Sequence, residues 1–170
     1  MTNTEQLTLL MLAEIHEHLK IKDSEVSPEP AFIKRAIVTG NVWAISKDRY
    51  PPEVSEVYDV LDMWRALEQG YRKLEKNDQE RVKTAAGGAP EMSGFDGHED
   101  QLSIADFIIN DMGLYPELKN RADVDCHHST QGAYRNMLTK FESVRARLGS
   151  ELGSAMAADE IIDVLVGRQL

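Results

Sequence analysis

The sequence predicts an all-α protein, a single compact domain over residues 1–170 with about six helices and a Gly-rich loop in its middle. Apolar residues recur at intervals of three and four through most of the chain, the spacing that lines one face of a helix. No segment alternates apolar and polar residues convincingly, as a half-buried strand would. The chain of 170 residues also lies in the single-domain range.

A first helix is predicted over about residues 4–20. Asn3 and Gln6 stand where a capping box would close its first turn. The polar connector after residue 20 ends the element. The apolar residues that recur at helical spacing are Leu7, Leu10, Met11, Ile15 and Leu19.

A second, shorter helix is predicted around Phe32–Ile37. Ser27 followed by Pro28 is typical of a helix start, because proline is tolerated in the first turn, where its missing N–H is not needed. Gly40 is expected to end the helix, since glycine adopts the left-handed conformation at low cost. The apolar run NVWAIS after it is too short to assign.

The clearest predicted helix begins after Pro51 and ends near Leu74. Its wide apolar stripe predicts the central helix, whose aromatic residues are expected to pack in the core and not to stack on a cofactor. Gly70 interrupts it at a cost of about 1 kcal/mol relative to alanine, and would permit close approach of a neighbouring helix. The stripe comprises Val54, Val57, Tyr58, Leu61, Trp64, Leu67, Tyr71 and Leu74.

The second half of the chain begins with the Gly-rich loop around Gly87–Gly94. It is expected to be a surface linker, because it lacks the lysine and the strand-to-helix context of a phosphate-binding loop. Ser129 or Thr130 is placed to cap a helix further on. Helical spacing predicts three helices after the loop, over Leu102–Met112, Tyr134–Leu148 and Ile161–Leu165.

Charge argues against a nucleic-acid partner. Twenty-nine acidic against nineteen basic residues give a net charge of -10, so phosphate backbones repel the chain unless its basic residues gather on one face. Acidic residues interrupt the densest basic run, which favours a solvated surface. That run contains Arg72, Lys73, Lys76, Arg81 and Lys83.

Other features of the sequence predict a cytoplasmic protein. No run approaches the roughly 18 apolar residues that a membrane span needs, so no membrane interaction is expected. The N-terminal segment has neither a basic region nor a small-residue cleavage site. The single Cys126 fits a reducing compartment.

The segment NRADVDCHHSTQG, residues 120–132, concentrates side chains that could bind metal. Zinc would need three or four converging donors at about 2.0–2.3 Å, whereas adjacent histidines normally point in different directions. No Cys-x-x-Cys or His-x-x-x-His spacing occurs, so a solvated loop is favoured over a metal site, and no cofactor is predicted. The candidate ligands are Asp123, Asp125, Cys126, His127 and His128, joined by Asp96, His98, Glu99 and Asp100 if the segment FDGHED meets them in space.

Two catalytic hypotheses use the same segment. Arg121 and His127 have five residues between them, which resembles the Arg-x(4–6)-His pattern of helical RNA-cleaving toxins of the HEPN superfamily. The arginine would stabilise the phosphorane charge and the histidine would transfer protons. The pattern is short, and residues 120–129 are expected to form a connector. Cys126 as a nucleophile is weaker still, since sequence neighbours rarely reach the geometry that a base requires.

The chain resembles the YfbU family of bacterial proteins from TEQLTLLML to its end. The motifs that carry the resemblance are, in order, VYDVLDMWRALEQGYRKL, SGFDGHED, YRNMLTKFESV and ADEIIDVL. The resemblance implies a small helical cytoplasmic protein that self-associates, with a homodimer expected. It implies no catalytic residues, and it is loosest around DVDCHH.

The function predicted from the sequence is therefore non-enzymatic, acting through self-association or through binding of another protein. Two long helices carry wide apolar stripes, and exposed parts of such stripes are natural partner surfaces. The alternative is an RNA-cleaving or metal-dependent hydrolase centred on Arg121 and His127. That alternative requires both residues to line a cleft.

Overall fold

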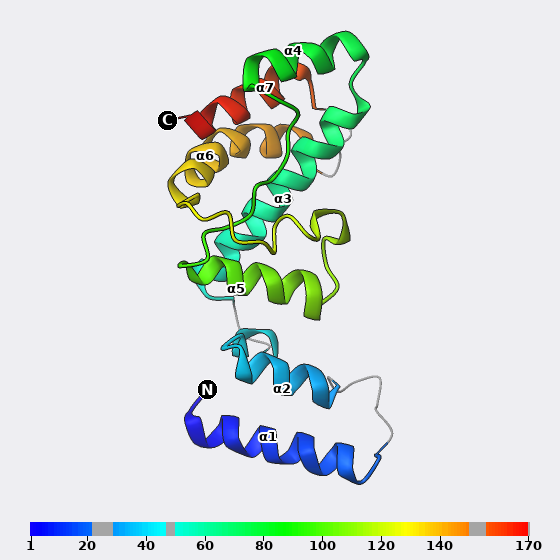
Figure 1. Cartoon of the computed structure of the whole chain (residues 1–170), viewed down its shortest axis with the longest axis vertical. Helices are drawn as coiled ribbons and strands as arrows, with labels where there is room; N and C mark the ends of the chain where they lie inside the picture. Colours follow the sequence, from blue (N-terminus) through cyan, green and yellow to red (C-terminus); the bar gives the residue numbers. More distant parts are fainter. Residues whose placement is uncertain (22–28, 47–49, 150–155, 170) are drawn as a thin grey trace.

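The longest helix, α3 (Pro52–Lys73), is surrounded by the α-helices that follow it in the chain, while the two N-terminal helices lie beyond its N-terminal end (Figure 1). The computed structural model describes residues 1–21, 29–46, 50–149 and 156–169. Within these ranges the chain forms seven α-helices and no β-strand, which confirms the all-α fold class. No helix in the same ranges is both long and apolar enough to cross a membrane.

Helix α3 supplies the centre of the core, as predicted. Its prolines stand at the start, where no backbone hydrogen bond is lost, and the helix ends before Leu74. The Trp64 ring meets Tyr134 edge-on at 5.9 Å, and Tyr134 meets Phe95 at 5.7 Å, so these aromatic residues pack in the core. The buried residues of α3 are Val54, Val57, Val60, Leu61, Met63, Trp64, Ala66, Leu67, Glu68 and Gly70.

Three helices that follow α3 in the chain pack around it. Helices α6 (Gln131–Leu148) and α7 (Ala158–Val166) pack on α3 and on each other, and α4 (Lys76–Ala86) lies against α7 (Figure 1). A Cβ on Gly70 would lie 3.1 Å from Cβ of Met156 and 3.4 Å from Cδ1 of Ile161. This glycine therefore lets the α7 segment approach α3, as predicted.

The sequence predicts no helix where α4 lies. Only Val82 of this helix is buried, so the apolar periodicity that reveals the other helices is absent. Ion pairs of three-residue spacing, Arg81 with Asp78 and Lys83 with Glu80, support the helix instead. Acidic neighbours therefore pair with three of the five basic residues of the run, Arg72, Arg81 and Lys83.

Helix α5 (Asp100–Asp106) continues into a π-helical turn, η2 (Phe107–Asp111). The two together cover most of the predicted Leu102–Met112 helix. Phe107 of the turn packs on the rings of Trp43 at 5.9 Å and Phe32 at 5.4 Å. These aromatic contacts attach the N-terminal helices to the body of the molecule.

The N-terminal helices α1 (Asn3–His18) and α2 (Pro30–Val38) form one end of the molecule (Figure 1). Helix α1 packs on α2, and α2 packs on the short 3-10 helix η1 (Val42–Ala44) and on η2. Of the residues in α1, only Ala13 is buried. Helix α1 is therefore attached through one side.

The predicted starts of these two helices need correction. The capping box of α1 uses Thr2 and Glu5 in place of Asn3 and Gln6, because the N–H of Thr2 donates to Glu5 Oε2 at 2.6 Å and the N–H of Glu5 donates to Thr2 Oγ1 at 3.3 Å. Helix α2 begins at Pro30. The predicted cap at residues 27–28 lies outside the described residues.

Candidate functional site

The loop around Asp125 lies against the loop around Phe95, so the two segments rich in potential metal ligands are neighbours. The N–H of Cys126 donates to the carbonyl of Phe95 at 3.0 Å, and the N–H of Gly97 donates to Asp125 Oδ1 at 2.8 Å. A Cβ on Gly97 would overlap the Asp125 carboxylate. Glycine at this position thus allows the loops to touch.

The Asp125 carboxylate organises its own loop. It accepts the N–H of His127 at 2.7 Å and lies 2.9 Å from Nδ1 of the same residue. The backbone hydrogen bonds from His127 and then Gly97 lower the pKa of Asp125. His127 itself has a left-handed backbone, with φ of 57°, and its side chain is 84% exposed. The imidazole therefore contacts Asp125 at the surface.

Cys126 and His128 contact each other's backbone. The thiol of Cys126 donates to the carbonyl of His128 at 3.1 Å, and Nδ1 of His128 lies 2.6 Å from the carbonyl oxygen of Cys126. A nucleophilic cysteine needs an imidazole nitrogen directed at its sulfur. The contacts of these two side chains are with backbone carbonyls, which is a different arrangement.

The candidate metal ligands lie near one another without converging. Within the described ranges, no three His, Cys, Asp or Glu side chains are placed to hold a metal ion. Asp123 instead accepts from Asn110 at 3.0 Å, and Glu99 accepts from Ser129 at 2.9 Å. The metal-site hypothesis consequently gains no geometric support for Asp123, Asp125, Cys126, His127 and His98.

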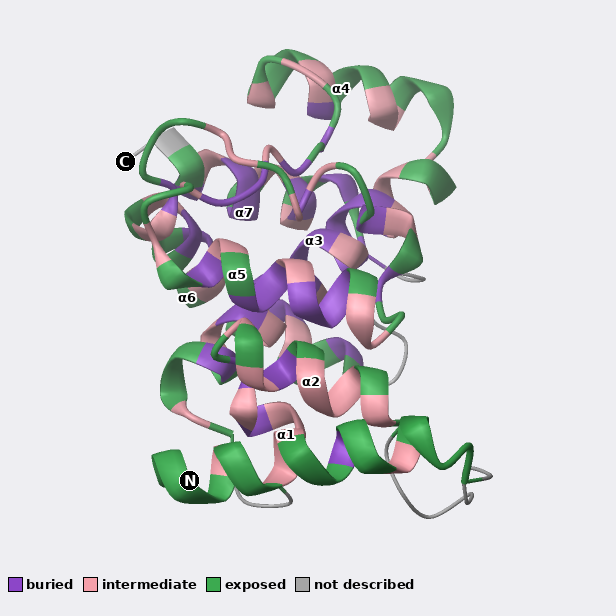
Figure 2. Ribbon diagram, turned by 60° about the horizontal axis from the view of Figure 1, so that its bottom comes forward, coloured by how far each residue is buried: buried purple, intermediate pink, exposed green. Residues whose placement is uncertain are grey.

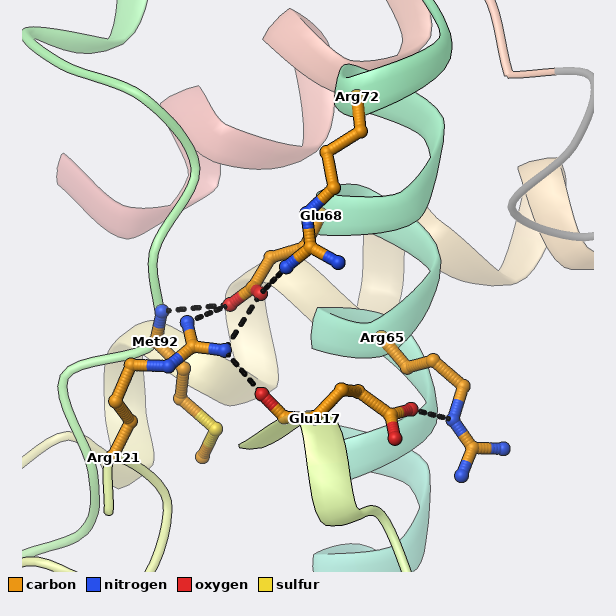
Figure 3. Close-up of polar contacts among 6 residues, drawn as sticks. All are labelled: Arg65, Glu68, Arg72, Met92, Glu117 and Arg121. Atoms are coloured by element: carbon orange, nitrogen blue, oxygen red, sulfur yellow. Dashed lines mark hydrogen bonds and ion pairs between the residues drawn. The ribbon is translucent and has the colours of Figure 1, made fainter. Parts of the chain in front are cut away.

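Arg121, the arginine of the nucleolytic hypothesis, is bound by a buried carboxylate on α3 (Figure 3). Both terminal nitrogens of its guanidinium donate to Glu68, and Nη2 does so at 2.8 Å. Nη2 also donates to the carbonyl of Glu117 at 2.7 Å. The hydrogen bonds with Glu68 raise the pKa of Arg121. Arg121 and His127 thus have different partners, and no contact between them is formed.

Glu68 connects three parts of the chain (Figure 3). Besides Arg121, it accepts the N–H of Met92 at 3.3 Å and Nη2 of Arg72 at 3.1 Å. Only 3% of Glu68 is exposed, and carboxylates are rarely buried unless they are paired. Sequence reasoning misses this residue, because one glutamate on a helix carries no signal of its burial.

A hollow of about 420 Å³ lies beside the Asp125 loop and is acidic. Four carboxylates line it, which disfavours the approach of a phosphodiester. The hollow therefore does not offer the cationic cleft that RNA cleavage would require. Its lining residues are Gly97, His98, Glu99, Asp100, Leu102, Ser103, Asp106 and Asp123.

We expect acid to weaken the Asp125 loop. Hydrogen bonds lower the pKa of Asp125 in the folded state, so the carboxylate contributes stability above its unfolded pKa of about 3.9 and loses it as pH falls through the folded value. In a His127→Ala protein the N–H donors remain, so the pKa of Asp125 should stay depressed. NMR titration of the Asp125 carboxyl checks this, and a pKa at or above the usual value would contradict it.

A different surface is conspicuous for its apolar exposure. Of the eleven large apolar residues that are exposed in the described part of the chain, seven lie within residues 1–21. Four of them lie on α1, a fifth is its C-cap residue Leu19, and each of the five is at least half exposed; we call them the α1 stripe: Leu7, Met11, Leu12, Ile15 and Leu19. Figure 2 shows α1 as mostly exposed along its length.

The opposite side of α1 is apolar as well. Leu9, Leu10 and Ala13 are partly or wholly buried, and α1 makes its contacts with α2 there. An ion pair between Glu17 and Lys34, at 2.6 Å, adds to this attachment. Helix α1 therefore has two apolar sides, of which one is covered.

A groove of about 790 Å³ lies beside the N-terminal half of α1. Trp43 in its wall is 8% exposed, and the indole N–H donates to Asn41 Oδ1 at 2.9 Å, which fixes the ring. The lining is mainly apolar. We call this the Trp43 groove, and its residues are Met1, Thr4, Glu5, Thr8, Leu9, Val42, Trp43, Ile45, Ser46 and Pro51.

Comparison with known families identifies the chain. The model of the YfbU domain family matches residues 1–165, so the chain belongs to this family and the resemblance is confirmed. Comparison with curated proteins gave no significant match, and neither did comparison with solved structures. The family match covers α1 and the Asp125 loop alike and assigns chemistry to neither.

Proposed function

We propose that this member of the YfbU family acts through self-association, with α1 as the contact surface between copies. The observation that carries the proposal is that α1 is apolar on two opposite sides, whereas its contacts with α2 cover one. A helix whose apolar residues extend beyond the side that its neighbour covers has apolar surface left for a further contact. Contiguous exposed apolar surface is also typical of interaction sites.

The distribution of charge supports a second copy as the partner. Each chain carries a net charge of -10, so two copies repel each other over most of their surfaces. The α1 stripe itself is uncharged, and Glu14 and His18 border it. A twofold dimer requires a surface that is complementary to itself, and an uncharged apolar stripe meets that requirement. A cytoplasmic location is part of the same proposal. The chain has a single cysteine, and an association through apolar contacts needs no disulfide, so both fit a reducing compartment.

Charged substitutions in the α1 stripe should dissociate the dimer. The double variant Met11→Glu, Ile15→Glu removes four half-exposed apolar side chains from a twofold interface and places like charges there. At about 1 kcal/mol for each side chain, the dissociation constant should rise at least about a thousandfold. Light scattering after size-exclusion chromatography measures the change in mass.

A matched control separates this effect from a general effect of added charge. Val38 on α2 is 76% exposed and lies outside the α1 stripe, so Val38→Glu should leave the mass unchanged. Val38→Glu should unfold at the same urea concentration as the wild type, because the substituted side chain is largely exposed. The double variant should match wild-type protein that has been diluted until it is monomeric, since dimerisation itself stabilises the wild type at higher concentration. A double variant that dimerises as tightly as the wild type would disprove the role of α1.

A further inference from the structure

We infer that the α1 helices of two copies pair in antiparallel orientation, and that Leu19 of each copy enters the Trp43 groove of the other. This inference rests on the proposed self-association and adds its geometry and its specificity. The groove is mainly apolar and next to the α1 stripe, and Leu19, at 63%, is the most exposed member of that stripe. The same contact would occur twice in a twofold dimer.

Four of the five residues of the α1 stripe are placed symmetrically along the helix; Leu12 is the exception, because Glu14 stands at the equivalent position on the other side of Ala13. Leu7 and Leu19 lie six residues on either side of Ala13, and Met11 and Ile15 lie two residues on either side. If two helices run antiparallel with Ala13 at the centre, Leu7 lies level with Leu19 of the second copy, and Met11 lies level with Ile15. Each apolar residue of the outer and inner pairs thus meets another apolar residue.

The position of the groove also favours the antiparallel orientation. On α1 the groove is lined by residues between Met1 and Leu9, in the half that precedes Ala13. With a rise of about 1.5 Å per residue, Leu19 lies about 9 Å beyond Ala13 and reaches the level of Leu7 in the other copy. In a parallel pair Leu19 would lie level with Leu19 of the second copy, about 15 Å along the helix from Leu9 and the groove.

Leu19 and the groove lie on the same side of α1. Thr8, which lines the groove, is eleven residues before Leu19, a separation of about three helical turns. In an antiparallel twofold pair, equivalent sides of the two helices face the same side of the pair. In a parallel twofold pair, equivalent sides face opposite sides of the pair. Leu19 of one copy is therefore directed toward the groove of the other only in the antiparallel arrangement.

Charge at the two ends of α1 agrees with this pairing. Glu5 lines the groove near the N-terminus, and Lys20 follows Leu19 at the C-terminus. The antiparallel arrangement brings the Glu5 carboxylate of one copy near the Lys20 ammonium of the other. It also places the dipoles of the two helices in opposite directions, which is the favourable orientation. Helix α1 ends at this point, because Lys20 has a φ of 51° and the N–H of Ile21 donates to the carbonyl of His16 at 3.2 Å. In the antiparallel pair this end lies beside the groove of the partner.

Cysteine cross-linking tests the inference. Cys126 is the single cysteine, so Cys126→Ser gives a background without thiols, and the serine hydroxyl retains the hydrogen bond to the carbonyl of His128. Thr8→Cys and Leu19→Cys are then made in two separate proteins, both at exposed positions. The two proteins are mixed so that they exchange subunits, and a thiol-reactive linker of about 8 Å is then added. In an antiparallel pair the two Thr8 positions are about 15 Å apart along the helices and the two Leu19 positions about 18 Å apart, so this linker cannot join either pair.

The antiparallel arrangement predicts that the mixture cross-links at least about tenfold more than either protein alone. If each protein cross-links to itself and the mixture shows no preference, the helices are parallel and the inference is wrong, although the self-association stands. Sedimentation of the same proteins before linking separates the two failures, because monomers at every concentration would refute the proposed self-association as well. A mass that grows beyond two chains would contradict the twofold contact.

Discussion

Glu68→Ala is expected to destabilise the protein by about 3 kcal/mol, the largest effect of any single side-chain removal outside the apolar core. Removing the carboxylate leaves the Arg121 guanidinium, whose side chain is only 23% exposed, without its two strongest acceptor contacts. The N–H of Met92 loses its acceptor at the same time. Breaking a buried ion pair costs about 3–5 kcal/mol, and the partial exposure of Arg121 places this case at the lower end.

Urea denaturation of the Glu68→Ala protein measures this effect. Arg72→Ala is the matched control, because Arg72 binds the same carboxylate from a side chain that is 59% exposed, and its loss should cost less than about 1 kcal/mol. Equal effects of the two substitutions would mean that the buried contact with Arg121 contributes little to stability.

Gly94→Ala is expected to cost about 3 kcal/mol or more. Gly94 has a φ of 94°, a conformation in which a residue with a Cβ is strained by about 1–3 kcal/mol. The added Cβ would also overlap the carbonyl oxygen of Val124 and come within 2.8 Å of that of Arg121. Since both obstacles are backbone atoms, the two loops must separate, and the hydrogen bond of 2.7 Å from Tyr134 Oη to the Gly94 carbonyl is disturbed.

Gly88→Ala supplies the control for that prediction within the same Gly-rich segment. A Cβ at Gly88 would meet no atom within 4 Å, and its backbone is not left-handed. Its free energy of unfolding should therefore change by less than about 1 kcal/mol, with a gain possible through the lower entropy of the unfolded chain. A Gly94→Ala protein as stable as Gly88→Ala would show that the two loops do not need their close contact.

The parts of the fold that follow from the sequence are those in which apolar spacing decides the structure. Helix α3 occupies the predicted range, because its apolar residues recur over six turns and its prolines mark the start. The close approach at Gly70 is predicted correctly for a similar reason, since a glycine inside so regular a helix needs an explanation in packing. Local pattern and tertiary structure agree in these places.

Helix α4 and the position of Glu68 do not follow from the sequence. In α4 a single buried residue, Val82, leaves the local ion pairs and packing against α7 to stabilise the helix, and neither produces an apolar period. The burial of Glu68 depends on Arg121, which is fifty-three residues further along the chain. Such a pairing is fixed only when the fold brings the two segments together.

The sequence directs attention to a different surface from the one that we propose. The cluster at residues 120–132 is chemically rich, but its side chains mostly bind their own loops or, through Arg121, α3. The apolar residues of α1 are predicted from their spacing to line one face of a helix, and that spacing does not show which of them stay exposed. Which side of an apolar helix stays exposed depends on what packs against it, and here α2 covers one side only.

Sedimentation equilibrium of the wild-type protein tests the central claim most directly. We expect a mass of twice the 19.1 kDa of one chain at about 100 µM, with dissociation on dilution. Because the contact is apolar, the dimer should persist at about 0.5 M salt, where charge-driven association is screened. A mass of one chain at every concentration would contradict self-association through α1.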